Sequence, residues 1–274
     1  MPPAIETHEK AISQWLKPNG VGVEIGALTT PIPGLKPFYV DRFAEYAGQP
    51  CLAVYWGDAC HLPFRSNSLD YVASSHVLEH VANPVAALLE WHRVLAHGGV
   101  IYMVIPDRPF TFDHPRGLTD PEHMWADYEN QVDQYDGTHI YDFVDKIDWP
   151  MYRPDVAPED LDSDRAAFRD QLVYDLEHKK EFNMHFHVFE KSNLEQFIQL
   201  IAKRKKLSWK IKGYVNSFPA DCPNGIFMAI RVNKSWIERF KPWVNRLLTR
   251  RKKTFPLLPS AKPISDSDKM RRSC

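Results

Sequence analysis

The sequence predicts an α/β fold built around a doubly wound, mostly parallel sheet. Short apolar runs alternate with helix-like stretches over about the first hundred residues, a pattern typical of consecutive β and α units. Several of these runs end on a glycine or an acidic residue, at the edge of the sheet where such folds bind ligands. The composition, with 44% hydrophobic and 25% charged residues in 274, is globular and excludes disordered and collagen-like classes.

The elements of this sheet follow one another in order along the first part of the chain. A short helix is predicted over residues 8–16 and ends at a proline, an asparagine and a glycine. Apolar runs then predict five strands, at residues 21–25, 38–40, 52–56, 69–74 and 100–105. A helix over residues 84–96 lies between the last two strands, with Gly98 and Gly99 at its C-terminal end.

The regular pattern breaks after the fifth strand. Residues 107–182 hold 20 acidic and 8 basic side chains, and helices are predicted over residues 121–135 and 163–181. We expect an insertion that forms a lid or a substrate wall. A helix and an antiparallel hairpin are then predicted to complete the sheet, at residues 191–203, 207–215 and 225–232.

Charge and cysteine content bound the class of protein. A net charge of −1 lacks the basic excess of proteins that bind nucleic acid, so no nucleic-acid partner is expected. No CxxC pair occurs, so neither a zinc site nor a disulfide framework is predicted from the cysteines, which are Cys51, Cys60, Cys222 and Cys274. The first residues lack the features of a secretory signal, and no apolar run approaches the roughly 18 residues of a membrane span. We expect a cytoplasmic protein.

A glycine and three acidic residues stand at the ends of the first three strands. Gly26 follows the first strand, where the missing side chain lets a ligand approach the backbone. Asp41 ends the second strand, where an acid can accept the ribose hydroxyls of a nucleoside. Asp58 follows the third strand, where it can receive an adenine amino group, and Glu24 lies within the first. A nucleoside-bearing cofactor needs this arrangement.

Five motifs then follow one another between Val21 and Pro106. They read VEIG, YVD, GDACHLPF, LDYVASSHVLEHV and HRVLAHGGVIYMVIP. In this order and spacing the chain resembles the class I S-adenosyl-L-methionine (SAM)-dependent methyltransferases, and within them the type-11 group. The resemblance implies a Rossmann-like, mostly parallel seven-stranded sheet with an antiparallel C-terminal hairpin and an insertion after the fifth strand. It also implies that SAM is the cofactor.

The resemblance assigns a role to each strand end. The methionine end of the cofactor is expected at Gly26 and its neighbours, and the transferable methyl group near Ser75 and His76. The full set of implied cofactor-binding residues is Glu24, Gly26, Ala27, Asp41, Arg42, Asp58, Ala59, Ser75 and His76. One departure concerns the loop after the first strand, which reads EIGALTTPIPG where the family usually has two or three glycines. Hydroxyls of Thr29 or Thr30 could take over the contact with the cofactor carboxylate.

Four sections are expected on this basis. Residues 1–106 form the cofactor-binding half of the methyltransferase domain, 107–190 the acidic insertion on the acceptor side, and 191–233 the closing helix and antiparallel strands. Residues 234–274, with 12 basic and 3 acidic side chains, are expected to be a basic amphipathic helix and a disordered tail. The helix fits either peripheral contact with an anionic membrane or packing on the domain.

Two other enzyme classes share part of these motifs. The HVLEH stretch, from His76 to His80, matches the H-x-x-E-H pattern of a zinc peptidase, but the surrounding strands favour nucleotide binding. A nicotinamide enzyme expects G-x-G-x-x-G, and here only Gly26 lies in the turn. A third alternative, prompted by the unusual loop, is a cofactor-binding module without catalytic activity.

An alcohol acceptor loses its proton as it attacks the methyl group, so a histidine or carboxylate base is expected nearby. By position the candidates are His76, Asp107, His114 and His185. His185 and His187 would share one face of a strand, where they could bind a metal with an acid from the insertion or line a wall. No metal site is predicted.

The insertion suggests the kind of acceptor. Its carboxylates can accept hydroxyl hydrogens, and Trp125, Tyr128 or Tyr135 could stack on a sugar ring. We therefore expect O-methylation of a sugar or glycan hydroxyl. The alternatives are another small-molecule acceptor, such as a quinone, an acid or a lipid, and an insertion that is only a solvated acidic lid.

Overall fold

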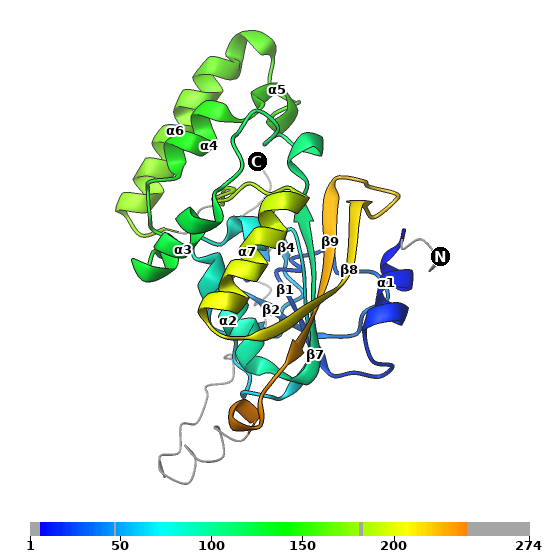
Figure 1. Cartoon of the computed structure of the whole chain (residues 1–274). Helices are drawn as coiled ribbons and strands as arrows, with labels where there is room; N and C mark the ends of the chain where they lie inside the picture. The colour runs from blue at the N-terminus through cyan, green and yellow to red at the C-terminus, as the bar shows by residue number, and fades with distance from the viewer. Residues whose placement is uncertain (1–5, 47, 181–182, 240–274) are drawn as a thin grey trace, which may run out of the picture.

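The computed structural model describes residues 6–46, 48–180 and 183–239. Its core is a seven-stranded sheet in the order β5-β2-β1-β6-β7-β9-β8 (Figure 1). Five strands run parallel, namely β1 (Gly22–Ile25), β2 (Phe38–Asp41), β5 (Tyr55–Trp56), β6 (Leu69–Ser75) and β7 (Leu95–Pro106). The last two pair antiparallel, β8 (Ser208–Phe218) and β9 (Gly225–Asn233). The predicted sheet, with its antiparallel C-terminal hairpin, is confirmed.

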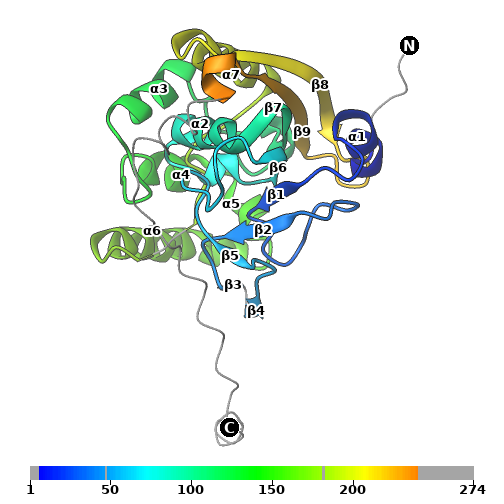
Figure 2. The same cartoon turned by 90° about the horizontal axis from the view of Figure 1, so that it is seen from below.

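Helices cover both faces of the sheet (Figure 2). On one face α2 (Pro84–Val94) and α7 (Lys191–Arg204) bury Leu88, Trp91 and Phe197 against the apolar side chains of the strands. On the other face α1 (His8–Trp15) packs Ala11 against a smaller cluster that includes Tyr102. Within the described part of the chain this short helix is the only one on the face of Tyr102, so the two helix layers are unequal.

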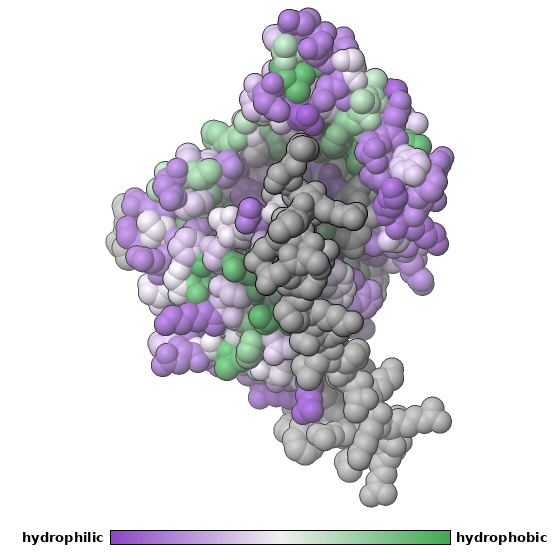
Figure 3. All heavy atoms as spheres, turned by 180° about the vertical axis from the view of Figure 1, so that it is seen from behind, coloured by the Kyte–Doolittle hydropathy of each residue, from purple (hydrophilic) through white to green (hydrophobic). Residues whose placement is uncertain are grey.

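The insertion after β7 has a hydrophobic core of its own. It contains α3 (Pro121–Glu129), α4 (Ile140–Lys146), α5 (Trp149–Tyr152) and α6 (Leu161–Glu177). Their apolar side chains pack together, and Met184 and Phe186 from the returning chain complete this cluster. The insertion lies beyond the carboxyl end of β7 (Figure 1), and its tip is largely hydrophilic (Figure 3). Its helices therefore stand over the edge of the sheet where ligands bind.

Several predicted elements differ in detail. Between β1 and β2, where no helix was predicted, the described residues contain none, because Pro31, Pro33 and Pro37 oppose one. A two-stranded sheet of β3 (Glu45–Tyr46) and β4 (Gln49–Pro50) was not predicted, and α4 and α5 were also missed. The third strand of the main sheet shrinks to β5, because only Tyr55 and Trp56 pair with β2.

The glycines after α2 do not cap it. The helix ends at Val94, and Gly98 and Gly99 lie within β7, where the register against β6 shifts. Gly98 has a φ of +80°, which suits a bulge in the strand.

The predicted basic helix near the C-terminus falls mostly on residues 240–274, outside the described part of the chain. In its described part, Trp236 and Ile237 are exposed. None of the helices in the described residues is both long enough and apolar enough to cross a membrane.

Candidate functional site

A cleft of about 920 Å³ opens where β1, β2, β5 and β6 end. Its size is near the upper end of the range of about 300–1,000 Å³ typical of small-molecule sites. Residues 128–135 of the insertion form part of its wall. Eight of the nine predicted cofactor-binding residues line it, namely Gly26, Ala27, Asp41, Arg42, Asp58, Ala59, Ser75 and His76.

Glu24, the ninth predicted residue, lies beneath this lining. Its side chain is 1% exposed, and one carboxylate oxygen accepts a hydrogen bond of 2.8 Å from the backbone N–H of Ile32. The second oxygen has no hydrogen-bond partner among the described residues. Burial raises the pKa of Glu24 to about 7. The structure therefore places Glu24 as a support for the loop over residues 26–32.

This loop keeps its shape with a single glycine at its start. Gly26 has a φ of +69°, and a Cβ atom there would lie 2.7 Å from Cγ2 of Val77, so a side chain would clash. Leu28 also has a positive φ, of +49°, and its N–H donates a hydrogen bond of 3.3 Å to Asp41. Its carbonyl accepts a hydrogen bond of 2.8 Å from Leu52. One bond to the Asp41 carboxylate and one to the backbone of Leu52 thus hold this turn at Leu28.

Two carboxylates face the cleft next to this loop. Asp41 is 4% exposed, and its oxygens accept hydrogen bonds from the N–H groups of Leu28 and Phe43. Each carboxylate oxygen has two lone pairs, so Asp41 retains acceptor capacity toward ligand hydroxyls. Asp58 is half-exposed and accepts a hydrogen bond of 2.6 Å from the N–H of Cys60. Both carboxylates are therefore fixed in position and still open to the cleft.

His76 lies at the end of β6 with an unusual backbone. Its φ is +53°, and its N–H donates a hydrogen bond of 2.9 Å to Val104, which fixes the residue at the carboxyl edge of the sheet. Its side chain is 36% exposed and lines the cleft. Burial among neighbouring groups lowers the pKa of His76 to about 4. The imidazole is therefore neutral at pH 7 and can accept a proton.

Behind His76 lies a fully buried acid. Glu79 belongs to the short 3-10 helix Leu78–His80, and one of its carboxylate oxygens lies 3.8 Å from Nδ1 of His76 and 3.6 Å from Nε2 of His80. Among the described residues neither oxygen has a hydrogen-bond partner. Burial raises the pKa of Glu79 well above its ordinary value. The stretch from His76 to His80 is thus not one helical turn with two histidines on one face.

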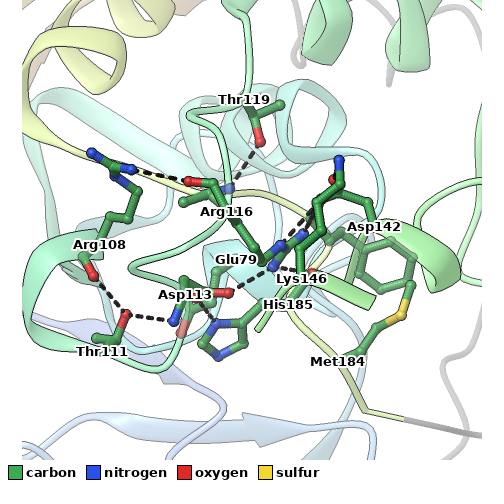
Figure 4. Close-up of polar contacts among 12 residues, drawn as sticks. Glu79, Arg108, Thr111, Asp113, Arg116, Thr119, Asp142, Lys146, Met184 and His185 are labelled. Atoms are coloured by element: carbon green, nitrogen blue, oxygen red, sulfur yellow. Dashed lines mark hydrogen bonds and ion pairs between the residues drawn. The ribbon is translucent and has the colours of Figure 1, made fainter. Parts of the chain in front are cut away.

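A network of Asp113, Arg116, Asp142 and His185 lies in the insertion (Figure 4). The ring of His185 contacts that of His80 edge-on at 4.5 Å, and its Nδ1 lies 2.5 Å from Asp113. Arg116, which is fully buried, donates to Asp113 at 2.7 Å and also binds Asp142. Burial alone would raise the pKa of Asp113, but its partners His185 and Arg116 hold it below its ordinary value. The buried charges are therefore paired.

Of the four predicted bases, only His76 lines the cleft. Asp107 is buried, and its N–H donates to the carbonyl of Asn224. His114 pairs with Asp148 at 2.6 Å, and His185 lies behind His80. His185 and His187 do not share a site, because residues 183–190 form an irregular segment and not a strand. Sequence proximity to a strand end did not determine the direction of these side chains.

The structure adds cleft residues that the sequence did not single out. From the insertion and the chain that returns from it these are Gln131, Val132, Asp133, Gln134 and Asn183. Gln134 accepts a hydrogen bond from Arg42, which joins the insertion to the end of β2. No local signal marked them, because their approach depends on how the insertion folds back.

The raised pKa of Glu24 predicts a pH-dependent contribution to stability. Its folded pKa of about 7 exceeds the ordinary 4.5, so the folded chain holds a proton that the unfolded chain releases between these values. We expect the free energy of unfolding of the wild type, relative to Glu24→Gln, to fall by about 3 kcal/mol as the pH rises across this range. Urea unfolding at a series of pH values measures the difference. A constant difference would mean that Glu24 is ionised in the folded chain.

Comparison with known proteins finds sequence similarity in the first half of the chain. Residues 39–103 match the family model described as a methyltransferase domain. Over 106 residues the chain is 34% identical to an uncharacterized 37.1 kDa protein in transposon Tn4556 of Streptomyces fradiae, covering 35% of this chain and 31% of that protein. Over 53 residues it is 43% identical to a demethylmenaquinone methyltransferase of Staphylococcus epidermidis, covering 19% and 22%. The chain thus spans less than a third of the length of these two curated relatives.

Solved structures resemble the chain over a longer stretch at low identity. A SAM-dependent methyltransferase from Thermotoga maritima is 17% identical, with 83% of this chain and 90% of that chain covered and a TM-score of 0.42. A protein from Pyrococcus horikoshii is 15% identical, with 84% and 89% covered and a TM-score of 0.45. The match to a methyltransferase domain thus covers residues 39–103, which run from β2 into β7 of the sheet described above.

Proposed function

We propose that this protein transfers the methyl group of SAM to a hydroxyl group of a sugar or glycan. The observation that carries the proposal is that the neutral imidazole of His76 shares one cleft with Gly26 and Asp41. A nucleoside cofactor site and a proton acceptor are thus combined in one cavity. The acceptor and the position methylated go beyond the family assignment.

The strand ends supply what the cofactor needs. The backbone of the loop over residues 26–32 would take the methionine end, and the Asp41 carboxylate would accept the ribose hydroxyls. Asp58 and the backbone of Ala59 would contact the adenine, and the Ala59 carbonyl is itself fixed by the indole N–H of Trp91 at 2.9 Å. When bound, SAM provides a methyl group on a sulfonium, which is a good leaving group.

His76 would remove the proton of the attacking hydroxyl. Neutral at pH 7, it has a free lone pair, and its side chain is open to the cleft. Glu79 is buried behind the ring, with one carboxylate oxygen 3.8 Å from Nδ1, a distance too long for a hydrogen bond. A base placed in this way aligns the acceptor as well as activating it.

The insertion side of the cleft favours a polyhydroxylated acceptor. It presents two phenols, at Tyr128 and Tyr135, together with the amide and carboxylate groups of Gln131, Asp133, Gln134 and Asn183. Such groups can exchange hydrogen bonds with several hydroxyls, and the tyrosine rings can pack on a sugar face. Trp125, which we also expected to stack, is buried, and its indole N–H donates to Glu129. It does not line the cleft.

The quinone alternative rests on the similarity to demethylmenaquinone methyltransferases, which covers 19% of the chain. The six polar side chains on the acceptor side argue for the sugar, since a quinone ring offers only two carbonyl acceptors.

For the location, we propose the cytoplasm, because Cys51, Cys60 and Cys222 are free thiols.

Replacing Asp41 should weaken cofactor binding without unfolding the chain. The change Asp41→Asn keeps the size of the side chain but removes the charge that would accept the ribose hydroxyls. We expect S-adenosylhomocysteine to bind 10- to 100-fold more weakly by calorimetric titration, since hydrogen bonds to a charged group contribute about 1.5–3 kcal/mol. Asp145→Asn, at an exposed position in the insertion, is the matched control and should bind as the wild type does.

A folded wild type that does not bind S-adenosylhomocysteine would contradict the proposal. The altered loop after β1 would then have lost the cofactor, and the chain would be a non-enzymatic module. Binding without transfer to any acceptor would point to the same module with its cofactor site retained.

The role of His76 can be tested with labelled SAM and a panel of sugars and quinones. We expect transfer to a sugar hydroxyl, and a loss of at least about 100-fold in kcat for His76→Asn, which removes the base. Asparagine tolerates the positive φ of this position, so the backbone should be preserved. Because the pKa of His76 is lowered to about 4, the wild-type rate should be constant between about pH 6 and 8.

Two outcomes would overturn this assignment. Transfer to a quinone but to no sugar would refute the proposed acceptor. A rate that rises through about pH 6.5, the ordinary imidazole value, would mean that a different or unshifted histidine is the base.

A further inference from the structure

Four side chains that methyl transfer does not use converge within the insertion. Three of them, His123, Asp127 and His139, bring possible ligand atoms together, and His187 lies beside Asp127. We propose that these four side chains form a binding site for Zn²⁺ that fastens α3, α4 and the returning chain to one another. The site is separate from the predicted catalytic groups. It does not depend on the acceptor or on methyl transfer.

The four side chains come from three different segments. His123 and Asp127 lie four residues apart on α3, so both project from one face of this helix. His139 immediately precedes α4, and His187 lies in the irregular segment that returns from the insertion to α7. A cation held by all four would join α3, α4 and the returning chain at one point.

One oxygen of Asp127 is the centre of the cluster. Its Oδ2 atom lies 3.6 Å from Nε2 of His123, 4.0 Å from Nε2 of His139 and 4.0 Å from Nε2 of His187. The Nε2 atoms of His123 and His139 lie 3.4 Å apart. Bond lengths of about 2.0–2.1 Å to tetrahedral Zn²⁺ separate ligand atoms by about 3.3 Å. The contact between Asp127 and His123 is therefore about 0.3 Å longer than this spacing, and the two contacts of 4.0 Å would shorten by about 0.7 Å on binding.

The cluster contains a buried carboxylate oxygen that has no hydrogen-bond partner among the described residues. Asp127 is 6% exposed and His187 is fully buried. Among the described residues the Oδ2 atom of Asp127 has no hydrogen-bond partner, although three imidazoles surround it. A buried carboxylate oxygen without a partner is costly, and a cation bound to it would remove this cost.

The surroundings fit a metal site in two further respects. The backbone of Phe186 hydrogen-bonds to His139, as outer-shell groups commonly do to orient a ligating imidazole. His123 is 49% exposed and borders a surface pocket of about 560 Å³, which gives a cation a route to the buried ligands. Nε2 of His187 lies 3.3 Å from the Ala82 carbonyl. This hydrogen bond is long and therefore weak, so His187 can give it up to bind a cation.

The donor set selects the class of cation. Three imidazoles and one carboxylate suit Zn²⁺ and its neighbours Co²⁺ and Ni²⁺, whereas Mg²⁺ and Ca²⁺ prefer oxygen ligands. Four protein ligands leave no open position, as in structural zinc sites. We therefore assign this site a structural role.

A second group, Glu79, His80 and His185, also brings possible ligand atoms together. Its histidines already have partners, since His80 bonds to the carbonyl of Met184 at 3.0 Å and His185 to Asp113. The group also adjoins the cofactor cleft. It serves as the competing site in the test.

The test uses the untagged full chain, stripped of metal with a chelator and then titrated with Zn²⁺ and, separately, Co²⁺. We expect one equivalent of Zn²⁺ by mass spectrometry and calorimetry, and a tetrahedral Co²⁺ spectrum without the charge-transfer band of a thiolate ligand. Asp127→Asn and His139→Gln should each weaken binding by at least about 100-fold, since each removes a direct ligand. Circular dichroism checks that the variants are folded.

Two control variants sharpen the result. His178→Asn changes an exposed histidine of the insertion, and His80→Gln changes the competing group. Both should bind Zn²⁺ as the wild type does. Absence of tight binding by the wild type, or binding that His80→Gln abolishes and Asp127→Asn does not, would overturn the proposal.

Discussion

The shape of the cleft depends on two buried carboxylates that hold one loop from opposite sides. Glu24 accepts the N–H of Ile32 at the far end of the loop, and Asp41 accepts the N–H of Leu28 near its start. These bonds let Leu28 keep a left-handed conformation that an isolated residue would avoid at a cost of about 1–2 kcal/mol. The loop therefore forms a floor of backbone groups with one required glycine, Gly26.

In the insertion, as in this loop, buried charged groups bind partners of their own. Arg116 is fully buried because Asp113 and Asp142 both bind its guanidinium, and Asp113 in turn binds His185. The apolar cluster of the insertion surrounds this network. Asp127 departs from this rule, as Glu79 does, since its buried oxygen has no hydrogen-bond partner among the described residues. The rule that explains Arg116 thus also leads to the metal site.

Much of the cleft lining was predictable because position along a parallel sheet determines which residues meet. Each strand ends at the same edge, so Gly26, Asp41, Asp58 and His76 come together whatever the loops do between them. Side-chain direction was less predictable. Asp107 follows β7 directly, yet its backbone pairs with Asn224 and its side chain is outside the cleft.

The fold of the insertion could not be predicted from local sequence patterns. Its short helices α4 and α5 have few turns, so their apolar spacing is too brief to recognise. The contacts of Gln134 and His187 depend on how the chain folds back over the sheet edge. A rule for strands predicted one shared face for His185 and His187, and it failed because their segment is irregular.

The central claim, that this cleft holds the cofactor, is tested most directly by a crystal structure of the full chain with S-adenosylhomocysteine. The account predicts the ribose hydroxyls within about 3 Å of the Asp41 carboxylate. It also predicts the sulfur between the Gly26 loop and the imidazole of His76. A nucleoside bound elsewhere, or bound in the cleft without contact to Asp41, would contradict it.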